Sequence, residues 1–426
     1  MKDNEQALVE ACKLDLGKQS YETYLTEVGW VENDIIFTCN HLVKWAQDEK
    51  AQDIDFNNSF VSPKIRSDPL GCVLVIGAYN FPIQLSMGPF IGAMAAGCTA
   101  ILKPSEGAPH SAAVMQRIIE TSLDPSSYTV VQGAIPETTA LLAEKWDKIF
   151  YTGGYVVGRI IAKKAAETLT PVALELGGLN PAIVTKNADV RLAAKRLLWG
   201  KIFNAGQVCL SQNYTLVDKE ILEEFIIQMK AAMKEFFPNG AKASPDYGRI
   251  ASDRHFLRMK AMVDNSNGKI IMGGEMDEKA RFIEPTVVVV NDVNDSLLKE
   301  ESFGPLIPIL AVDNLEQAIS IANSIQSTPL ALYPFGNKKE TAKILTEIRS
   351  GGASINEFVP PSALGFLRNA RPSLITPPSS KAPTSTAAFP PSPLVALASL
   401  ARAPIEAKPV STASPTNAAS PQPRHG

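Results

Sequence analysis

Gly71-Cys72-Val73-Leu74-Val75-Ile76-Gly77 opens a regular alternation of predicted strands and helices. The run is continuously apolar, which is typical of a parallel strand buried on both faces of its sheet. The patterns that follow predict strands at residues 99–104, 128–131, 148–151 and 171–174, and helices at 89–96, 108–123, 138–144 and 156–166. Strands separated by single helices predict a doubly wound α/β sheet of the Rossmann type.

The chain on either side of this region has different sequence patterns. Residues 1–50 have the apolar spacing of helices, and residues 51–70 are polar and predicted to be extended. A second α/β lobe is predicted over residues 180–355, with strands at 181–184 and 286–290 and helices at 220–236 and 315–325. Residues 357–426 are dominated by Pro, Ser, Thr and Ala. Such a composition buries too little apolar surface to offset its ordering entropy, so we expect a disordered tail.

The composition is that of a globular intracellular protein. Of the 426 residues 45% are hydrophobic and the net charge is −3, which favours a large core and argues against a nucleic-acid or anionic-membrane surface. No apolar run is long enough to span a bilayer, and the first residues lack the apolar stretch of a secretory leader. The five cysteines form no metal-ligand pattern. We therefore expect a cytoplasmic protein with reduced thiols, no metal and no nucleic-acid partner.

Two residues from separate segments carry the strongest chemical signal. Cys209 ends the stretch Phe203-Asn204-Ala205-Gly206-Gln207-Val208-Cys209, whose small residues leave a thiol open to substrate. Glu175 lies in Leu174-Glu175-Leu176-Gly177-Gly178, which is predicted to hold it in a Gly-rich turn. A lone cysteine is more often a buried apolar residue. Together with an acid that can activate water, however, the thiol predicts covalent catalysis on a carbonyl compound.

Polar residues that follow the first two strands are further candidates. Asn80 comes after the first strand, where α/β sheets bind ligands, and its amide could stabilise an oxyanion. Lys103 and Glu106 end the second strand, where the ribose of an adenine dinucleotide binds in Rossmann sheets. The alternatives are that Asn80 is an ordinary loop residue and that Lys103 and Glu106 form a solvated charge pair.

Two turns could hold the rest of a dinucleotide. Gly153, Gly154 and Gly158 lie between a strand and a helix, where free backbone amides can receive a pyrophosphate, although glycines in such turns also serve close packing. Glu301 precedes Phe303-Gly304-Pro305 and could bind a second ribose, with Phe303 against the nicotinamide. The alternative for Glu301 is a surface acid.

Taken together, these segments resemble the aldehyde dehydrogenase superfamily, and most of all its family 3 group, which includes fatty aldehyde dehydrogenases. The resemblance covers residues 5–356, and it is carried by residues 70–82, 97–106, 150–158, 170–181, 199–209, 247–255, 282–286, 300–305 and 350–356. It implies that Cys209 is the catalytic thiol, Glu175 the general base and Asn80 an oxyanion donor beside the Cys209 N–H. The remaining candidates match the family's contacts to NAD or NADP: Lys103, Glu106, Gly153, Gly154, Gly158, Glu301 and Phe303.

The resemblance also implies an organisation and an activity. Residues 1–50 and 71–176 would form the NAD(P)-binding domain, 177–356 the catalytic domain, and 51–70 part of a bridging sheet for homodimerisation. The implied reaction is NAD(P)-dependent oxidation of a small-molecule aldehyde to a carboxylic acid through a cysteine thiohemiacetal and a thioester. An acylating relative would also use a cysteine thioester, but a hydrolytic base such as Glu175 favours attack by water.

The sequence departs from the family at several points. Gly154 replaces a usual Ser, and Leu179 replaces a common Lys. From residue 357 the family's ending is replaced by the Pro-rich segment, as a frame change or alternative exon would produce. We therefore expect an incomplete bridging sheet, weak dimerisation and low stability. The alternative function is that of a truncated, catalytically impaired homologue that acts only as a nucleotide-binding or interaction protein.

Overall fold

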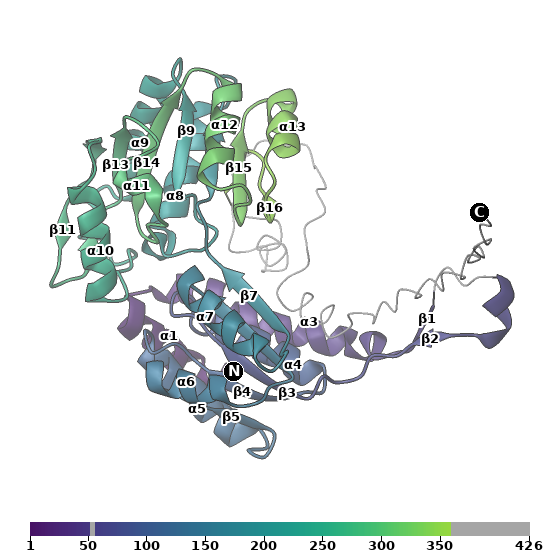
Figure 1. Cartoon of the computed structure of the whole chain (residues 1–426). Coiled ribbons are helices and arrows are strands. Elements are labelled where there is room, and N and C mark those ends of the chain that lie inside the picture. The colour runs from purple at the N-terminus through teal and green to yellow at the C-terminus, as the bar shows by residue number, and fades with distance from the viewer. Residues whose placement is uncertain (52–55, 359–426) are drawn as a thin grey trace, which may run out of the picture.

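The computed structural model describes residues 1–51 and 56–358; residues 52–55 and 359–426 lie outside the described part. Two lobes of sheet and helix pack together, and a hairpin projects away from them (Figure 1). The disorder predicted for residues 357–426 therefore concerns residues outside the description, except for Glu357 and Phe358.

The first lobe, drawn in purple and blue, contains a parallel sheet whose described strands follow the order β5-β4-β3-β6-β7 (Figure 1). The strands are β3 (Cys72–Ile76), β4 (Thr99–Lys103), β5 (Tyr128–Val130), β6 (Lys148–Gly153) and β7 (Val172–Leu176). The strand order reverses between β3 and β6, and ligands of open α/β sheets bind outside the carboxyl ends of the strands at such a switch point. The predicted Rossmann-type α/β lobe is confirmed.

Helices cover both faces of this sheet. The crossover helices are α4 (Gln84–Ala95), α5 (Pro109–Ser122), α6 (Ile135–Ala143) and α7 (Tyr155–Ala166). The N-terminal helices are α1 (Glu5–Leu16), α2 (Ser20–Thr23) and α3 (Gly29–Trp45), with a π-helical turn at Tyr24–Val28. Helix α1 packs on α5, and α3 packs on α4.

Three local predictions need correction. Helix α4 begins at Gln84 rather than 89, and Pro89 lies inside it, because the carboxylate of Glu27 accepts hydrogen bonds from the first backbone amides of α4. Helix α6 begins at Ile135 rather than 138, since a proline is well tolerated in a first turn. Glu175 lies in strand β7, paired in register with Thr152, rather than in a Gly-rich turn.

The second lobe, drawn in teal and green, has a mixed sheet in the order β10-β13-β14-β9-β8-β15-β16, as far as the described residues go (Figure 1). Its strands are β8 (Pro181–Val184), β9 (Tyr214–Asp218), β10 (Lys269–Met272), β13 (Thr286–Val290), β14 (Leu306–Val312), β15 (Ala331–Phe335) and β16 (Gly352–Ala353). Only β10 in this sheet runs antiparallel to its neighbour. The helices are α8 (Val190–Ile202), α9 (Leu222–Phe236), α10 (Asp253–Asp264), α11 (Ser296–Lys299), α12 (Leu315–Ile325) and α13 (Lys338–Glu347), and a small hairpin pairs β11 (Met276–Asp277) with β12 (Phe282–Ile283).

The chain remains packed slightly beyond the expected end of this lobe. Phe358 is buried and its ring stacks on Tyr333 with centroids 5.1 Å apart. Glu357 forms a 2.8 Å ion pair with Arg196 of α8. Residues packed against the second lobe therefore continue at least to Phe358.

The projecting hairpin pairs β1 (Glu49–Lys50) with β2 (Lys64–Ile65) in antiparallel register (Figure 1). Between the two strands lies a 3₁₀ helix, Phe56–Val61, where the sequence predicts an extended segment. Phe60 in this helix is 84% exposed. Among residues 1–51 and 56–358, no helix is both long and apolar enough to cross a membrane.

Candidate active site

The loop that carries Cys209 has a constrained backbone. Asn204, Ala205 and Gly206 follow α8 with φ of 48°, 50° and 73°. A glycine is required at position 206 because a Cβ there would overlap the Gly304 carbonyl group. Left-handed backbone at non-glycine residues is costly and concentrates at functional sites. The loop therefore lies directly against the turn that contains Glu301.

Side chains of the same loop hold this conformation. Gln207 is fully buried, and its amide nitrogen donates to the carbonyl oxygens of Asn204 at 3.1 Å and Arg249 at 3.0 Å. Its amide oxygen accepts from the Ala251 backbone N–H at 3.0 Å. Every polar atom of the Gln207 side chain is thus used, and the sequence motif gave no sign of this role.

Asn180 is a second residue that the sequence analysis did not single out. Its side-chain nitrogen donates to the carbonyl oxygens of Cys209 at 2.7 Å and Ser211 at 3.0 Å, while its oxygen accepts from the Ala331 N–H at 2.9 Å. This residue joins the Cys209 loop to strand β15. Its position immediately before strand β8, in a stretch quoted for the family resemblance, was the available signal.

The structure brings Asn80 to this loop. Asn80 is buried at the end of β3, and its side-chain nitrogen donates to the Gln207 carbonyl oxygen at 3.0 Å. Its own carbonyl oxygen accepts from the Asn204 side chain at 2.7 Å. The predicted oxyanion donor is therefore hydrogen-bonded to a residue that lies two positions before Cys209.

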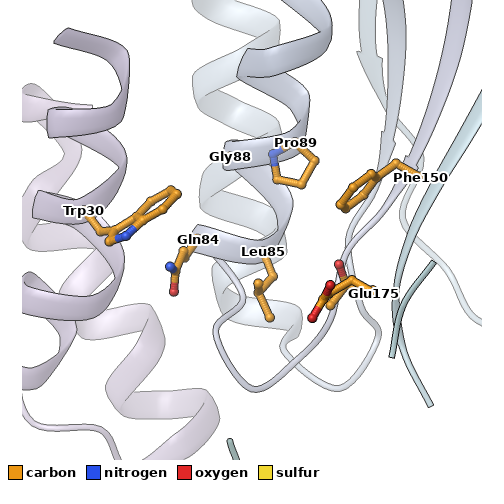
Figure 2. Close-up of a pocket in the computed structure, with 8 residues that line it drawn as sticks. Trp30, Gln84, Leu85, Gly88, Pro89, Phe150 and Glu175 are labelled. Atoms are coloured by element: carbon orange, nitrogen blue, oxygen red, sulfur yellow. The ribbon is translucent and has the colours of Figure 1, made fainter. Parts of the chain in front are cut away.

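Glu175 points into a small cavity between α3, α4 and the sheet (Figure 2). The cavity measures about 20 Å³, which is room for one water molecule. Its lining is mostly apolar and consists of Trp30, Gln84, Leu85, Gly88, Pro89, Phe150, Thr152 and Glu175. Burial raises the pKa of the Glu175 carboxyl, as a general base working near neutral pH requires.

Glu301 lies beside the turn that follows Glu175. A Cβ at Gly177 would overlap the Glu301 carboxylate, so only a glycine allows this approach. Burial raises the pKa of Glu301 to about 7, opposed by the charge of Lys201 and a hydrogen bond from the Gly178 backbone. Lys201 is itself buried, donates to the Gly304 carbonyl oxygen at 3.2 Å, and has a pKa lowered to about 7 by burial.

The electrostatics of Cys209 connect these groups. Burial, together with the charges of Glu175 and Glu301, raises the pKa of its thiol to about 12. Both carboxylates are therefore near enough to disfavour a thiolate. The raised pKa favours the protonated thiol at neutral pH.

Of the predicted dinucleotide contacts, Lys103 and Glu106 lie at the carboxyl end of β4 in the first sheet, and Phe303 lies before β14 in the second lobe. Lys103 is buried and forms a 2.8 Å ion pair with Glu106, which is half exposed. Partial burial opposes ionisation of Glu106, but hydrogen bonds from Lys103 and the backbone, together with the charges of Lys103 and Arg254, outweigh it and lower the pKa of that carboxyl. Phe303 has a φ of 49°, and its ring meets Tyr79 edge-on at 6.0 Å.

The turn at the start of α7 fits a phosphate group. Gly154 is the N-cap residue, and no side chain in the described chain caps this helix, so its first amides are free for an anion. A Cβ at Gly154 would meet nothing within 4 Å, which leaves space for a ligand. Gly158 instead permits close packing, since a Cβ there would press on Leu176 of β7.

Comparison with known proteins gives this site a family. Residues 1–366 match the profile described as "Aldehyde dehydrogenase family". The chain is 55% identical over 355 residues to β-apo-4′-carotenal oxygenase of Neurospora crassa, covering 83% of this chain and 67% of that protein. It is 42% identical over 361 residues to the dimeric NADP-preferring aldehyde dehydrogenase of Rattus norvegicus, covering 84% of this chain and 78% of the other.

A solved structure of similar fold supports the same family assignment. The substrate-bound AldH of Staphylococcus aureus superposes with a TM-score of 0.81 at 36% identity, over 85% of this chain and 79% of the other. More distant structures of the family were solved with NADP or NAD⁺. None of these findings favours the impaired, non-enzymatic alternative. The chain therefore belongs to the aldehyde dehydrogenase family, and its activity is the oxidation of an aldehyde with NAD or NADP.

Proposed function

We propose that Cys209 performs this oxidation as a nucleophile, with Glu175 as the base and Asn80 as an oxyanion donor. The Cys209 thiol releases its proton to solvent and the thiolate sulfur adds to the aldehyde carbon, while the Asn80 amide and the Cys209 N–H stabilise the oxygen that becomes negative. The resulting thiohemiacetal loses a hydride and becomes a thioester. Glu175 then takes a proton from water, the water oxygen attacks the thioester carbon, and cleavage of the C–S bond releases the carboxylic acid.

The observation that carries this proposal is the convergence of the three groups. Asn80 is hydrogen-bonded to the Cys209 loop, and the charge of Glu175 acts on the Cys209 thiol. The cavity beside Glu175 is large enough for one water molecule. These observations support one site for the nucleophile, the oxyanion donor and the base of a hydrolysed thioester.

Residues of both lobes would hold the cofactor. Lys103 and Glu106 would bind the adenosine ribose, Gly153 and Gly154 with the start of α7 the pyrophosphate, and Glu301 the second ribose, with Phe303 against the nicotinamide. The bound cofactor supplies the hydride acceptor. A negative Glu106 would repel a 2′-phosphate, whereas Lys103 would attract one, so both cofactors belong in the assay.

We assign the lobes accordingly. Residues 1–50 and 71–176 form the NAD(P)-binding domain, 177–356 the catalytic domain, and 51–70 the oligomerisation arm. The exposed hairpin β1–β2 supports a role for this arm in a homodimer. A cytoplasmic location accords with the reduced cysteines expected from the sequence. Sedimentation velocity and fractionation of the native source would test these assignments.

The likeness to β-apo-4′-carotenal oxygenase supports an elongated, apolar aldehyde as the substrate. The test is turnover of a series from short aliphatic to apocarotenoid aldehydes, with NAD⁺ and NADP⁺ in parallel. We expect kcat/KM to rise with apolar length and Cys209→Ala to abolish turnover of every member. Retained activity in Cys209→Ala would contradict the mechanism, and a preference for short aldehydes would contradict the substrate class alone.

A further inference from the structure

A buried ion pair from the N-terminal segment reaches the oxyanion site. The Nζ atom of Lys18 lies 2.7 Å from Glu27 Oε1, and the two side chains are 1% and 0% exposed. The same Nζ donates to the carbonyl oxygen of Asn80 at 3.2 Å and lies 4.2 Å from the centre of the Phe81 ring. The lysine ammonium is therefore satisfied by a carboxylate, a carbonyl and an aromatic face.

Glu27 uses its other oxygen on the same segment. Glu27 Oε2 accepts from the backbone N–H groups of Ile83 at 3.0 Å and Gln84 at 2.9 Å, at the start of α4. Glu27 itself lies in the π-helical turn Tyr24–Val28, a type of distortion that is frequent near functional sites. The ion pair thus holds both ends of the turn that begins at Asn80 and ends at α4.

This turn connects directly to the nucleophile loop. The Asn80 carbonyl that Lys18 contacts also accepts from the Asn204 side chain at 2.7 Å, and the Asn80 side chain donates to the Gln207 carbonyl at 3.0 Å. A buried ion pair is weak as a source of stability, because the cost of desolvating two charges offsets their attraction. What it does supply is a fixed position for the groups that it binds.

We propose that Lys18 and Glu27 are positioning residues that hold the Asn80 amide in the direction needed to stabilise the oxyanion. The proposal rests on the role given to Asn80 above. Both side chains are almost completely buried, and Lys18 contacts the Asn80 carbonyl, so the pair acts through Asn80. Loss of the pair leaves Asn80 in place but free to turn, which weakens its hydrogen bond to the oxyanion in the transition state and leaves substrate binding nearly unchanged.

The test is a mutant cycle at saturating cofactor. The paired change Lys18→Met with Glu27→Gln removes both charges together and leaves an oxygen to accept from the α4 amides. We expect kcat to fall about 10- to 100-fold with KM for the aldehyde within about twofold, and Asn80→Ala alone to lower kcat about 100-fold or more. In the Asn80→Ala background the paired change should cost less than about twofold, because its effect acts through Asn80.

Two controls distinguish a loss of Asn80 positioning from general damage to the protein structure. Asp15→Asn alters a buried carboxylate that accepts from two consecutive backbone amides, His110 and Ser111, at the start of α5, without contacting Asn80. It should leave kcat unchanged at saturating cofactor. Alkylation of Cys209 by iodoacetamide needs no oxyanion donor, so its rate should be the same in the paired variant and the parent.

The outcomes are distinct. Suppose that Asn80→Ala lowers kcat and that the paired change lowers kcat by the same factor in the Asn80→Ala background as in the parent. The positioning role is then wrong, and the role of Asn80 stands. If Asn80→Ala keeps full turnover, both assignments fail. Should the paired variant not fold, Lys18→Arg keeps the charge but replaces a point donor with a planar fork, and it should show the same fall in kcat at unchanged KM. Full kcat in a folded Lys18→Arg enzyme would overturn the proposal.

Discussion

At the scale of single residues, the protonation of Cys209 sets what the resting protein can do. Burial and the carboxylates of Glu175 and Glu301 raise the pKa of this thiol to about 12. At pH 8 only about one molecule in 10⁴ then carries the reactive thiolate. Below the raised pKa, each unit of pH increases the thiolate population about tenfold.

This pKa predicts opposite effects of one substitution in two assays. Glu175→Gln removes a negative charge that disfavours the thiolate, so alkylation of Cys209 in the cofactor-free protein should become faster, while aldehyde turnover should fall at least 100-fold because thioester hydrolysis loses its base. Peptide mass spectrometry would follow alkylation from pH 7 to 10, with the exposed Cys39 as a reference in the same sample. Slower alkylation in Glu175→Gln would instead identify Glu175 as the base that deprotonates Cys209.

At the scale of elements, close contacts between loops determine the geometry of the site. The Cys209 loop lies on the Glu301 turn because Gly206, at φ 73°, lacks a side chain where the Gly304 carbonyl lies. Gly240 has a comparable φ of 87°, but a Cβ there would meet nothing within 4 Å. A side chain at Gly206 would therefore meet both steric overlap and backbone strain, whereas one at Gly240 would meet backbone strain alone.

Alanine at these two positions should have unequal effects. Gly206→Ala adds overlap with the backbone to the cost of a left-handed φ, so we expect a loss of roughly 3 kcal/mol in unfolding free energy and loss of turnover. Gly240→Ala should lose about 1 kcal/mol and keep full turnover. Urea unfolding and steady-state rates would measure both, and equal losses at the two sites would contradict the packing described here.

The same contacts explain how far the sequence could be interpreted. The apolar run of β3 predicted its strand closely, because a strand buried on both faces has a local signature. The start of α4 was missed because its cap, Glu27, comes from a distant turn. Motif spacing singled out Cys209, Glu175 and Asn80, whereas Asn180, Gln207 and Lys18 act through contacts that no local pattern encodes.

At the scale of the whole molecule, the cofactor would bind along the carboxyl ends of the first sheet and face the second lobe. A ligand that binds only the folded state stabilises it by about 2.7 kcal/mol at a hundred times its Kd. Lys103 at the end of β4 and Lys148 at the start of β6 are both buried lysines at opposite ends of the sheet. Only Lys103 lies at the predicted cofactor edge.

These two lysines give a matched test of the cofactor site. Lys103→Met should raise the Kd for NAD⁺ about tenfold and reduce the thermal stabilisation that NAD⁺ gives, because it removes one charged hydrogen bond to the ribose. Lys148→Met should leave the Kd for NAD⁺ unchanged. Isothermal titration and thermal denaturation would measure both, and an equal effect of the two changes would place the cofactor elsewhere.

The proposed roles of Cys209 as the nucleophile and Glu175 as the base are tested most directly by trapping the acylated protein. Glu175→Gln mixed with aldehyde and NAD⁺ should release about one equivalent of NADH and then stop. Intact and peptide mass spectrometry should locate one acyl group on Cys209 and none in the double variant Cys209→Ala/Glu175→Gln. Continued turnover by Glu175→Gln, or an acyl group on any other residue, would contradict the assignment of these two residues.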